Sequence, residues 1–110
     1  MIPKAVQHEV GRILSLTFKV EDTNEVVDIT GRTITGLIET IPGPEYISRV
    51  ISGDLSITNG AGGVFEWTLH GDDTTYGEAF SVQFTATYSA DDILKSIPER
   101  WVVVRSIDWP

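Results

Sequence analysis

The sequence predicts an all-β fold, a single antiparallel β-sandwich of about seven to eight strands, from the alternation of its residues and its length. From Phe80 to Tyr88, every even position is apolar and every odd position is polar, which is the period of a half-buried strand. Strands of helix-covered parallel sheets are apolar throughout, so this alternation favours an antiparallel sheet with one exposed face. Similar alternation recurs between turn residues, and 110 residues is the usual size of one domain.

The predicted strands are separated by turn signals at the spacing typical of a sandwich. Leu14 to Val20 repeats the alternation after Gly11 interrupts a short first strand, and Ile41 to Pro44 ends the third strand. A glycine inside a strand, at Gly36, indicates a bulge or close packing. In chain order, we expect strands over residues 6–10, 14–20, 32–39, 46–51, 55–58, 65–69, 80–88 and 101–107.

The segment Ala90 to Ser96 leaves two alternatives open. An Asp there can cap one short helical turn that Pro98 would stop, or the segment is a plain hairpin loop. Either alternative fits a mostly antiparallel domain. No repeat or linker divides the chain, so we expect one domain over residues 1–110, with an N-terminal arm at 1–5 and a C-terminal tail at 107–110.

Composition excludes several classes of partner. Sixteen acidic residues stand against 8 basic ones, a formal net charge of −8, so the overall field repels a phosphate backbone and nucleic acid is not an expected partner. Cysteine is absent, which removes disulfides, thiolate metal ligands and thiol catalysis. The N-terminus lacks the pattern of a signal peptide, and no segment has the length and hydropathy of a membrane span. We expect a soluble protein made in the cytoplasm.

The residues needed for catalysis are not arranged in any recognised pattern. The two histidines, His8 and His70, have no second histidine at metal-binding spacing, and we expect both at the surface or at strand ends. No Gly-x-Ser-x-Gly nucleophile motif occurs. The glycines from Gly60 to Gly63 lack the lysine of a phosphate-binding loop. We therefore expect no enzymatic activity and no cofactor.

Two pairs of adjacent acidic residues are weak candidates for a calcium site, because calcium takes carboxylate and carbonyl oxygens from loops. Asp72 and Asp73 follow Gly71, and Asp91–Asp92 lies in the later loop. Neither pair has the spacing of a helix–loop–helix calcium motif. Adjacent acids in turns are more often turn formers, and that interpretation is favoured for both pairs.

The three tryptophans have different expected roles. Trp67 shares a face with Phe65 and Leu69, which predicts a core position. Trp101 opens the last predicted strand and fits either the end of the core or a half-exposed site. Trp109 lies beyond that strand, so it either folds back onto its own domain or inserts into a neighbouring subunit.

The order of these motifs resembles the immunoglobulin-like β-sandwich at the N-terminus of phage baseplate upper proteins and related tail or virion components. The resemblance spans roughly residues 11 to 107 and rests on structural motifs. In that family the module begins a longer polypeptide and has Asp-Gly in its penultimate hairpin, whereas this chain ends at Pro110 and has Asp91-Asp92 in a longer loop. The motifs are Gly11 with the strand to Val20, Val27–Gly31 with the strand 33–38, Gly62–Leu69, Thr74–Phe80 and Ile97–Trp101.

The resemblance implies a docking module in a symmetric assembly, without enzymatic activity. The leading hypothesis is a structural protein of a phage or prophage particle, in the tail, baseplate, neck or capsid surface, located in the virion after synthesis in the host cytoplasm. Its partners would be copies of itself and other virion proteins. The expected contact segments are Met1 to Lys4 and Ser106 to Pro110, with interface residues Ile2, Pro3, Trp109 and Pro110.

The alternative is a carbohydrate-binding sandwich, because sugars dock on exposed aromatic faces. Its platform would be Trp101, Tyr88 or Tyr46, with calcium at Asp72–Asp73 as a further expectation. This hypothesis predicts a monomer, whereas the assembly hypothesis predicts a homo-oligomer.

Overall fold

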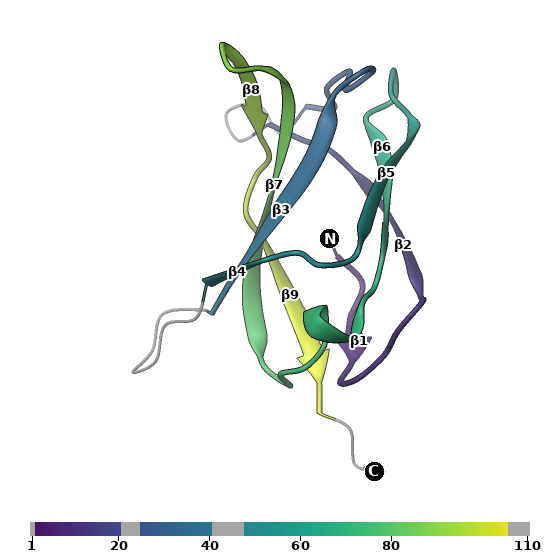
Figure 1. The fold of residues 1–110 in the computed structure, drawn as a ribbon, viewed down its shortest axis with the longest axis vertical. Helices are drawn as coiled ribbons and strands as arrows, with labels where there is room; N and C mark the ends of the chain where they lie inside the picture. The colour runs from purple at the N-terminus through teal and green to yellow at the C-terminus, as the bar shows by residue number, and fades with distance from the viewer. Residues whose placement is uncertain (1, 21–24, 41–47, 106–110) are drawn as a thin grey trace.

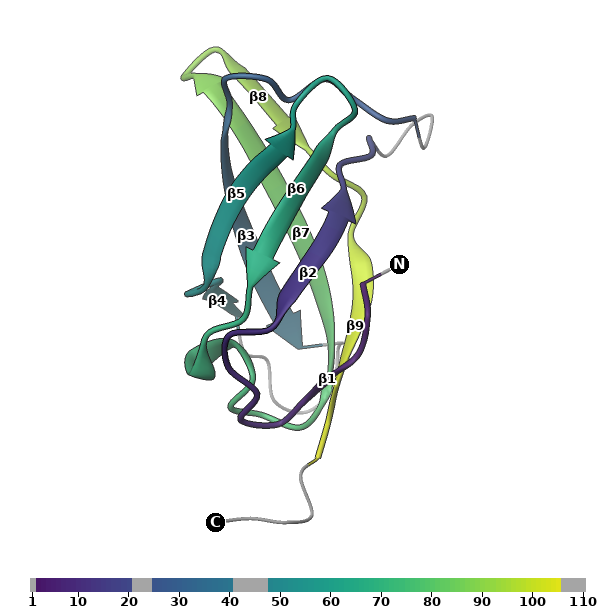
Figure 2. The ribbon, with the colours of Figure 1, turned by 90° about the vertical axis from the view of Figure 1, so that its right-hand side faces the viewer.

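The chain folds into two facing antiparallel sheets, the all-β sandwich that the alternation predicted (Figure 1). The computed structural model describes residues 2–20, 25–40 and 48–105. Figure 2 shows the smaller sheet in front of the larger one. The larger sheet has the order β1 (Ala5–Val6), β9 (Glu99–Val104), β7 (Ala79–Ser89), β3 (Thr33–Thr40), β4 (Ser48–Val50), with β8 (Asp92–Lys95) paired to β7; the smaller has the order β2 (Ile13–Thr17), β6 (Val64–Thr68), β5 (Asp54–Asn59).

The strand order is that of an immunoglobulin-like sandwich. In such domains strands B, E and D form one sheet, and strands C, F and G, extended by C′ in variable-type domains, form the other. Here β2, β6 and β5 take the first set of positions, and β3, β4, β7 and β9 take the second. β1 pairs with β9 in parallel, and the hairpin strand β8 is inserted between the F and G positions.

The core lies between the sheets and is built by the predicted alternation. Even-numbered residues of β7 up to Ala86 are buried, and so are the inward residues of β2 and β6. Trp67 is a core residue, as predicted, and Trp101 is equally buried against it, with ring centroids 4.7 Å apart. Because both indoles are inside, they fix the spacing of the two sheets.

Residues 90–96 contain a turn followed by the strand β8, Asp92–Lys95, so both the helical turn and the plain hairpin loop are wrong. Ile93 and Leu94 pair with Thr87 and Ala86 of β7, and these backbone ladders satisfy the peptide groups that a helical turn would have used. A 3₁₀ turn, η1, occurs instead at Gly71–Asp73.

Several strands differ from their predicted bounds; among them, β2 ends at Thr17 instead of Val20, and β9 begins at Glu99 instead of Trp101. The first strand ends at Val6, and the chain then turns through His8, whose φ is 70°. The strand predicted over 46–51 is β4, Ser48–Val50, within the described residues. Within the described residues, each of these segments pairs with a single neighbouring strand.

Gly36 is required by close packing, one of its two predicted roles. A Cβ on residue 36 would lie 2.3 Å from Cδ1 of Ile51 and 3.1 Å from Cδ1 of Phe84. These side chains occupy the space above the glycine, and Ile51 N donates a hydrogen bond to its carbonyl oxygen at 2.9 Å. The glycine therefore lets the segment after β4 pack flat against β3.

We expect Gly36→Ala to lower the free energy of unfolding by about 1–3 kcal/mol, because the added methyl overpacks the core. Urea denaturation followed by tryptophan fluorescence measures this loss. Thr35→Val, on the exposed face of the same strand, is the matched control and should stay within about 0.5 kcal/mol of the parent. Equal stability of the two variants would contradict the packing argument.

Candidate functional site

The Asp73 carboxylate is buried and accepts hydrogen bonds from four N–H groups. Its Oδ1 accepts from Ser52 N at 2.7 Å, and its Oδ2 accepts from Gly53 N at 2.9 Å. Oδ2 also accepts from Nε1 of Trp67 at 3.1 Å and from His70 N at 3.2 Å. One side chain of the 3₁₀ turn thus holds the segment before β5, the core indole and the segment after β6.

These contacts give Asp73, a weak calcium candidate in the sequence, a structural role in the turn. Every donor directs a hydrogen toward the carboxylate, and a cation cannot occupy the same positions. Asp72 is exposed, with its carboxylate 3.6 Å from Nδ1 of His70. Within the described residues, no group of three or more potential ligands is placed to hold a metal ion.

Arg49 of β4 closes this end of the sandwich. Its guanidinium donates to the carbonyl oxygens of Asp72 and Asp73, the latter at 2.9 Å, and lies 5.1 Å from the centroid of the Phe80 ring. Burial lowers the pKa of Arg49, and the nearby charge of Asp73 opposes that shift. The two residues together tie β4 to η1.

The histidines lie at turns, as predicted. His70 precedes η1, and its Nδ1 accepts a hydrogen bond from Asp72 N at 3.3 Å. His8 is exposed, and its backbone N–H donates to the carbonyl oxygen of Thr74 at 2.9 Å. No helix in the described part of the chain is long and apolar enough to cross a membrane.

The structure places only part of the predicted interface. The side chain of Ile2 is buried in the domain's own core, with 3% exposed, so it is not presented to a neighbour. Pro3 is exposed, and its carbonyl oxygen accepts from Nε1 of Trp101 at 3.1 Å. Met1, Trp109 and Pro110 lie outside the described residues.

Exposed apolar side chains lie side by side at the end of β9. Val6 and Val104 are register partners and are 47% and 45% exposed. Their chain neighbours Ala5 and Val103 are buried, so both exposed valines lie on the outer face of the larger sheet. The segment Ser106 to Pro110 follows Val104 after one intervening residue, Arg105.

Of the predicted sugar platform, only Tyr88 is exposed in the described structure. Trp101 is fully buried, which excludes it, and Tyr46 lies outside the described residues. Tyr88 is 68% exposed at the end of β7 and borders a shallow hollow of about 300 Å³. The other residues that line the hollow are Asp28, Thr30, Arg32 and Asp92.

Hydrogen bonds within the domain fix the positions of the polar side chains that line the hollow. Arg32 makes two hydrogen bonds to the Asp92 carboxylate, at 3.1 and 3.2 Å, and its guanidinium lies 5.9 Å from the Tyr88 ring centroid. The Thr30 hydroxyl and backbone N–H donate to Asp28, at 2.6 and 2.9 Å, and lower the pKa of Asp28. Asp28 therefore remains an anionic acceptor at neutral pH.

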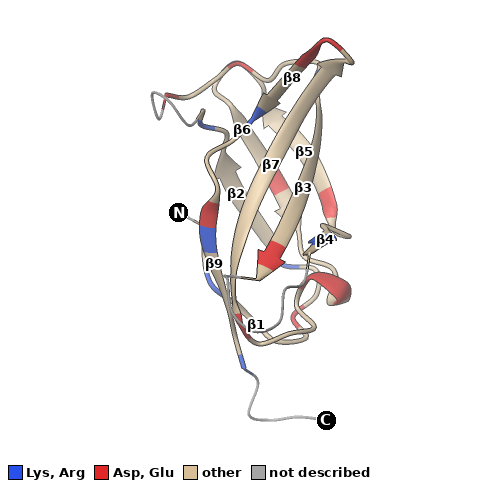
Figure 3. Cartoon of the chain, turned by 90° about the vertical axis from the view of Figure 1, so that its left-hand side faces the viewer, with Lys and Arg blue, Asp and Glu red and all other residues tan. Residues whose placement is uncertain are grey.

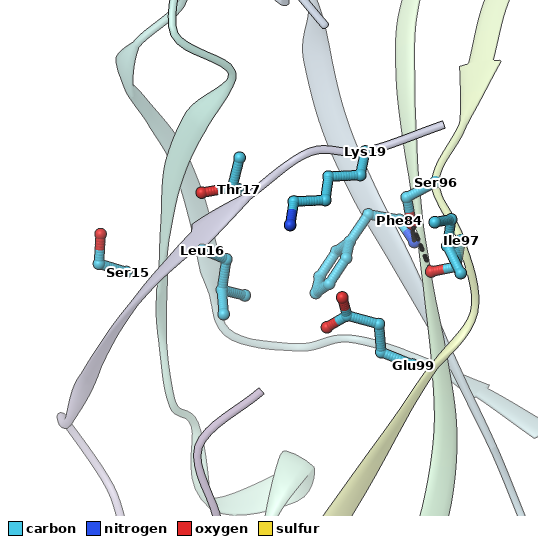
Figure 4. A pocket seen from close by; sticks show the side chains of 8 residues that line it. All are labelled: Ser15, Leu16, Thr17, Lys19, Phe84, Ser96, Ile97 and Glu99. Atoms are coloured by element: carbon cyan, nitrogen blue, oxygen red, sulfur yellow. Dashed lines mark hydrogen bonds between the residues drawn. The ribbon is translucent and has the colours of Figure 1, made fainter. Parts of the chain in front are cut away.

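A smaller cavity of about 140 Å³ opens at the edge of the smaller sheet, beside β2. Figure 4 shows Lys19 and Glu99 extending into the opening from its two walls, on either side of the Phe84 ring. Leu16 also lines the cavity, with Ser96 and Ile97 on the far wall. This cavity could not be predicted from the sequence, because its position depends on which strand lies at the edge of the smaller sheet.

Comparison with protein-family models and with curated proteins finds no match to this chain.

Asp73→Asn should lower the free energy of unfolding by about 3 kcal/mol or more, because an amide NH₂ would face N–H donors in a buried site. Chemical denaturation in buffers with and without calcium measures this loss. The adjacent and exposed Asp72→Asn is the matched control, expected within about 0.5 kcal/mol of the parent. Stabilisation by calcium that Asp73→Asn abolishes would overturn the structural role.

Proposed function

We propose that this protein is a non-enzymatic assembly component of a phage or prophage particle, acting through contacts with copies of itself and with other virion proteins. The virion setting comes from the motif resemblance. The observation that carries the assembly role is the exposed pair Val6 and Val104 at the start of the C-terminal segment. Adjacent exposed apolar side chains are typical of contact sites, and two further apolar residues, Ile107 and Trp109, follow this pair in the sequence.

The expected contact surface combines the valine pair with Ser106 to Pro110, in which Ile107 and Trp109 are apolar. Pro3 is exposed, and its carbonyl oxygen accepts a hydrogen bond from Nε1 of Trp101. Ile2 leaves the proposed contact set, because its burial stabilises the domain itself.

Deleting Ile107 to Pro110 should abolish self-association and leave the fold intact, because the deleted residues follow the last strand. Light scattering over a wide concentration range, for the parent and the shortened chain, measures this. Val104→Ser should weaken the association, and Val50→Ser, an exposed valine on β4, is the matched control. A shortened chain that associates as the parent does would contradict the proposal.

A second candidate function, carbohydrate binding, is favoured by the hollow beside Tyr88. An exposed ring next to fixed carboxylates and a guanidinium offers stacking and hydrogen bonds to sugar hydroxyls. The hollow volume, about 300 Å³, is at the lower end of the range for small-molecule sites. This function uses the end of the domain formed by the β7–β8 hairpin.

If the hollow binds glycans, Tyr88→Ala should reduce affinity at least tenfold, because stacking on the ring is lost. NMR titration of the labelled protein with a panel of glycans measures binding at the hollow. Tyr76→Ala removes another exposed tyrosine and should bind like the parent. Absence of binding by the parent across the panel would exclude this function.

A further inference from the structure

The outer edge of β2 has free backbone hydrogen-bonding groups. Leu69 N donates to the carbonyl oxygen of Arg12 at 2.8 Å, and Phe18 N donates to that of Gly63 at 2.7 Å. Even-numbered residues of this segment therefore direct their backbone groups toward β6, and odd-numbered ones direct theirs away. Ile13, Ser15 and Thr17 thus present their N–H and C=O groups outward, and no strand of the described residues pairs with them.

The edge of β2 also lacks the devices that protect other edges. The ladder of β2 with β6 runs without a shift through all five residues and contains no proline. By contrast, β5 carries an irregularity after Ile57, and β4 and β1 have only three and two residues. Natural edges are commonly blocked by bulges, prolines or short length. β2 has none of these.

The position beside β2 is one that immunoglobulin-like domains normally fill. Strand A pairs with strand B in that arrangement, and β2 is the B-position strand. Here β1 pairs with β9 instead. Beyond the C-terminal end of β2, the two sheets are joined by the bridge between Val20 and Ser96 and by the hydrogen bond from Ile97 N to Lys19 O at 2.9 Å. The open stretch is therefore bounded at Lys19.

The cavity lies where an added strand would direct its inward side chain. Leu16 of one sheet and Phe84 of the other give the cavity an apolar floor, whereas polar and charged side chains line its opening: Ser15, Thr17, Lys19, Ser96 and Glu99. Its volume of about 140 Å³ is below the roughly 300 to 1,000 Å³ of small-molecule sites, so it suits one side chain better than a metabolite.

Charge near the edge differs from the charge of the whole chain. Two cations, Arg12 and Lys19, stand at its two ends, although the chain carries a net charge of −8. Arg12 also forms an exposed ion pair with Glu9 at 3.5 Å, so Lys19 is the main cation for an incoming acid. On the other wall, Glu99 of β9 lines the cavity. Figure 3 shows acidic and basic bands next to each other along β9. Acidic residues at the ends of an incoming segment would face the two cations.

We propose that the β2 edge binds an extended segment of a partner protein, which adds as a strand beside Ile13 to Thr17, places one apolar side chain in the cavity and has acidic ends. This inference deepens the proposed assembly function and rests on it. Backbone hydrogen bonds supply affinity in such strand addition, and the cavity supplies selectivity.

The test uses the full chain and an array of nine-residue peptides with acidic ends, in which polar residues alternate with Val, Ile or Leu. We expect peptides of this class to bind, with slowed amide exchange at Ser15 and Thr17 in NMR. Thr17→Pro removes an outward N–H without touching the β6 ladder and should weaken binding at least tenfold. Thr17→Val keeps the N–H and should bind within about twofold of the parent.

Because Thr17→Pro can lower the stability of the fold, a second variant tests the same site through its charge. Lys19→Glu should weaken the acidic peptides severalfold, and peptides with a lysine at one end should recover the loss. Absence of any binder at about 1 mM peptide, or binding that leaves Ser15 and Thr17 unprotected, would overturn the inference. Dimerisation lost in Thr17→Pro without peptide binding would instead assign the edge to a second copy.

Failure of this inference is separable from failure of the assembly function. Self-association that depends on Ile107 to Pro110 but persists in Thr17→Pro, with no peptide bound, would leave the assembly function standing and overturn the edge site. Peptide binding at the edge in a protein that stays monomeric would support the edge site and contradict self-association.

Discussion

The hydrogen bonds accepted by the buried Asp73 carboxylate hold together one end of the sandwich, where η1 lies against the start of β5 and the segment after β6. The carboxylate satisfies four N–H groups from three chain segments, including the indole at the centre of the core. Gly53 must lack a side chain for this to occur, since a Cβ there would lie 2.1 Å from the Thr68 carbonyl oxygen. A buried charge with all its acceptors used is stable because each donor compensates part of the lost hydration.

From this anchor, the remaining features of the domain divide into two regions with different chemistry. The end of the domain that contains η1, at the bottom of Figure 1, is held by Asp73 and Arg49. It also carries the exposed valines of β1 and β9. The opposite end, formed by the β7–β8 hairpin, carries the hollow beside Tyr88 and its charged side chains Asp28, Arg32 and Asp92. Between them, the β2 edge opens directly into the space between the sheets. Rigid packing of the core keeps these surfaces in constant relative positions.

The edge of β2 and the apolar end of β9 support one kind of function. Both offer groups that a protein partner satisfies: backbone donors and acceptors at the β2 edge, and apolar surface on the outer face of β1 and β9. Strand edges of a sandwich are stable only when they are protected or used. The continuous, unblocked ladder of β2 is therefore the feature that most favours binding of another chain.

Local pattern determined most of the strands, because a period of two requires only neighbouring residues, and it placed Trp67 and the Phe80–Ala86 face in the core. The glycine at position 36 indicated a bulge or close packing, and the structure decided for close packing. Sheet order, the hairpin at 92–95, the burial of Ile2 and Trp101, and the four donors around Asp73 depend on segments far apart in the sequence. Only the tertiary structure decided these, because an edge or a buried carboxylate is defined by what the fold places beside it.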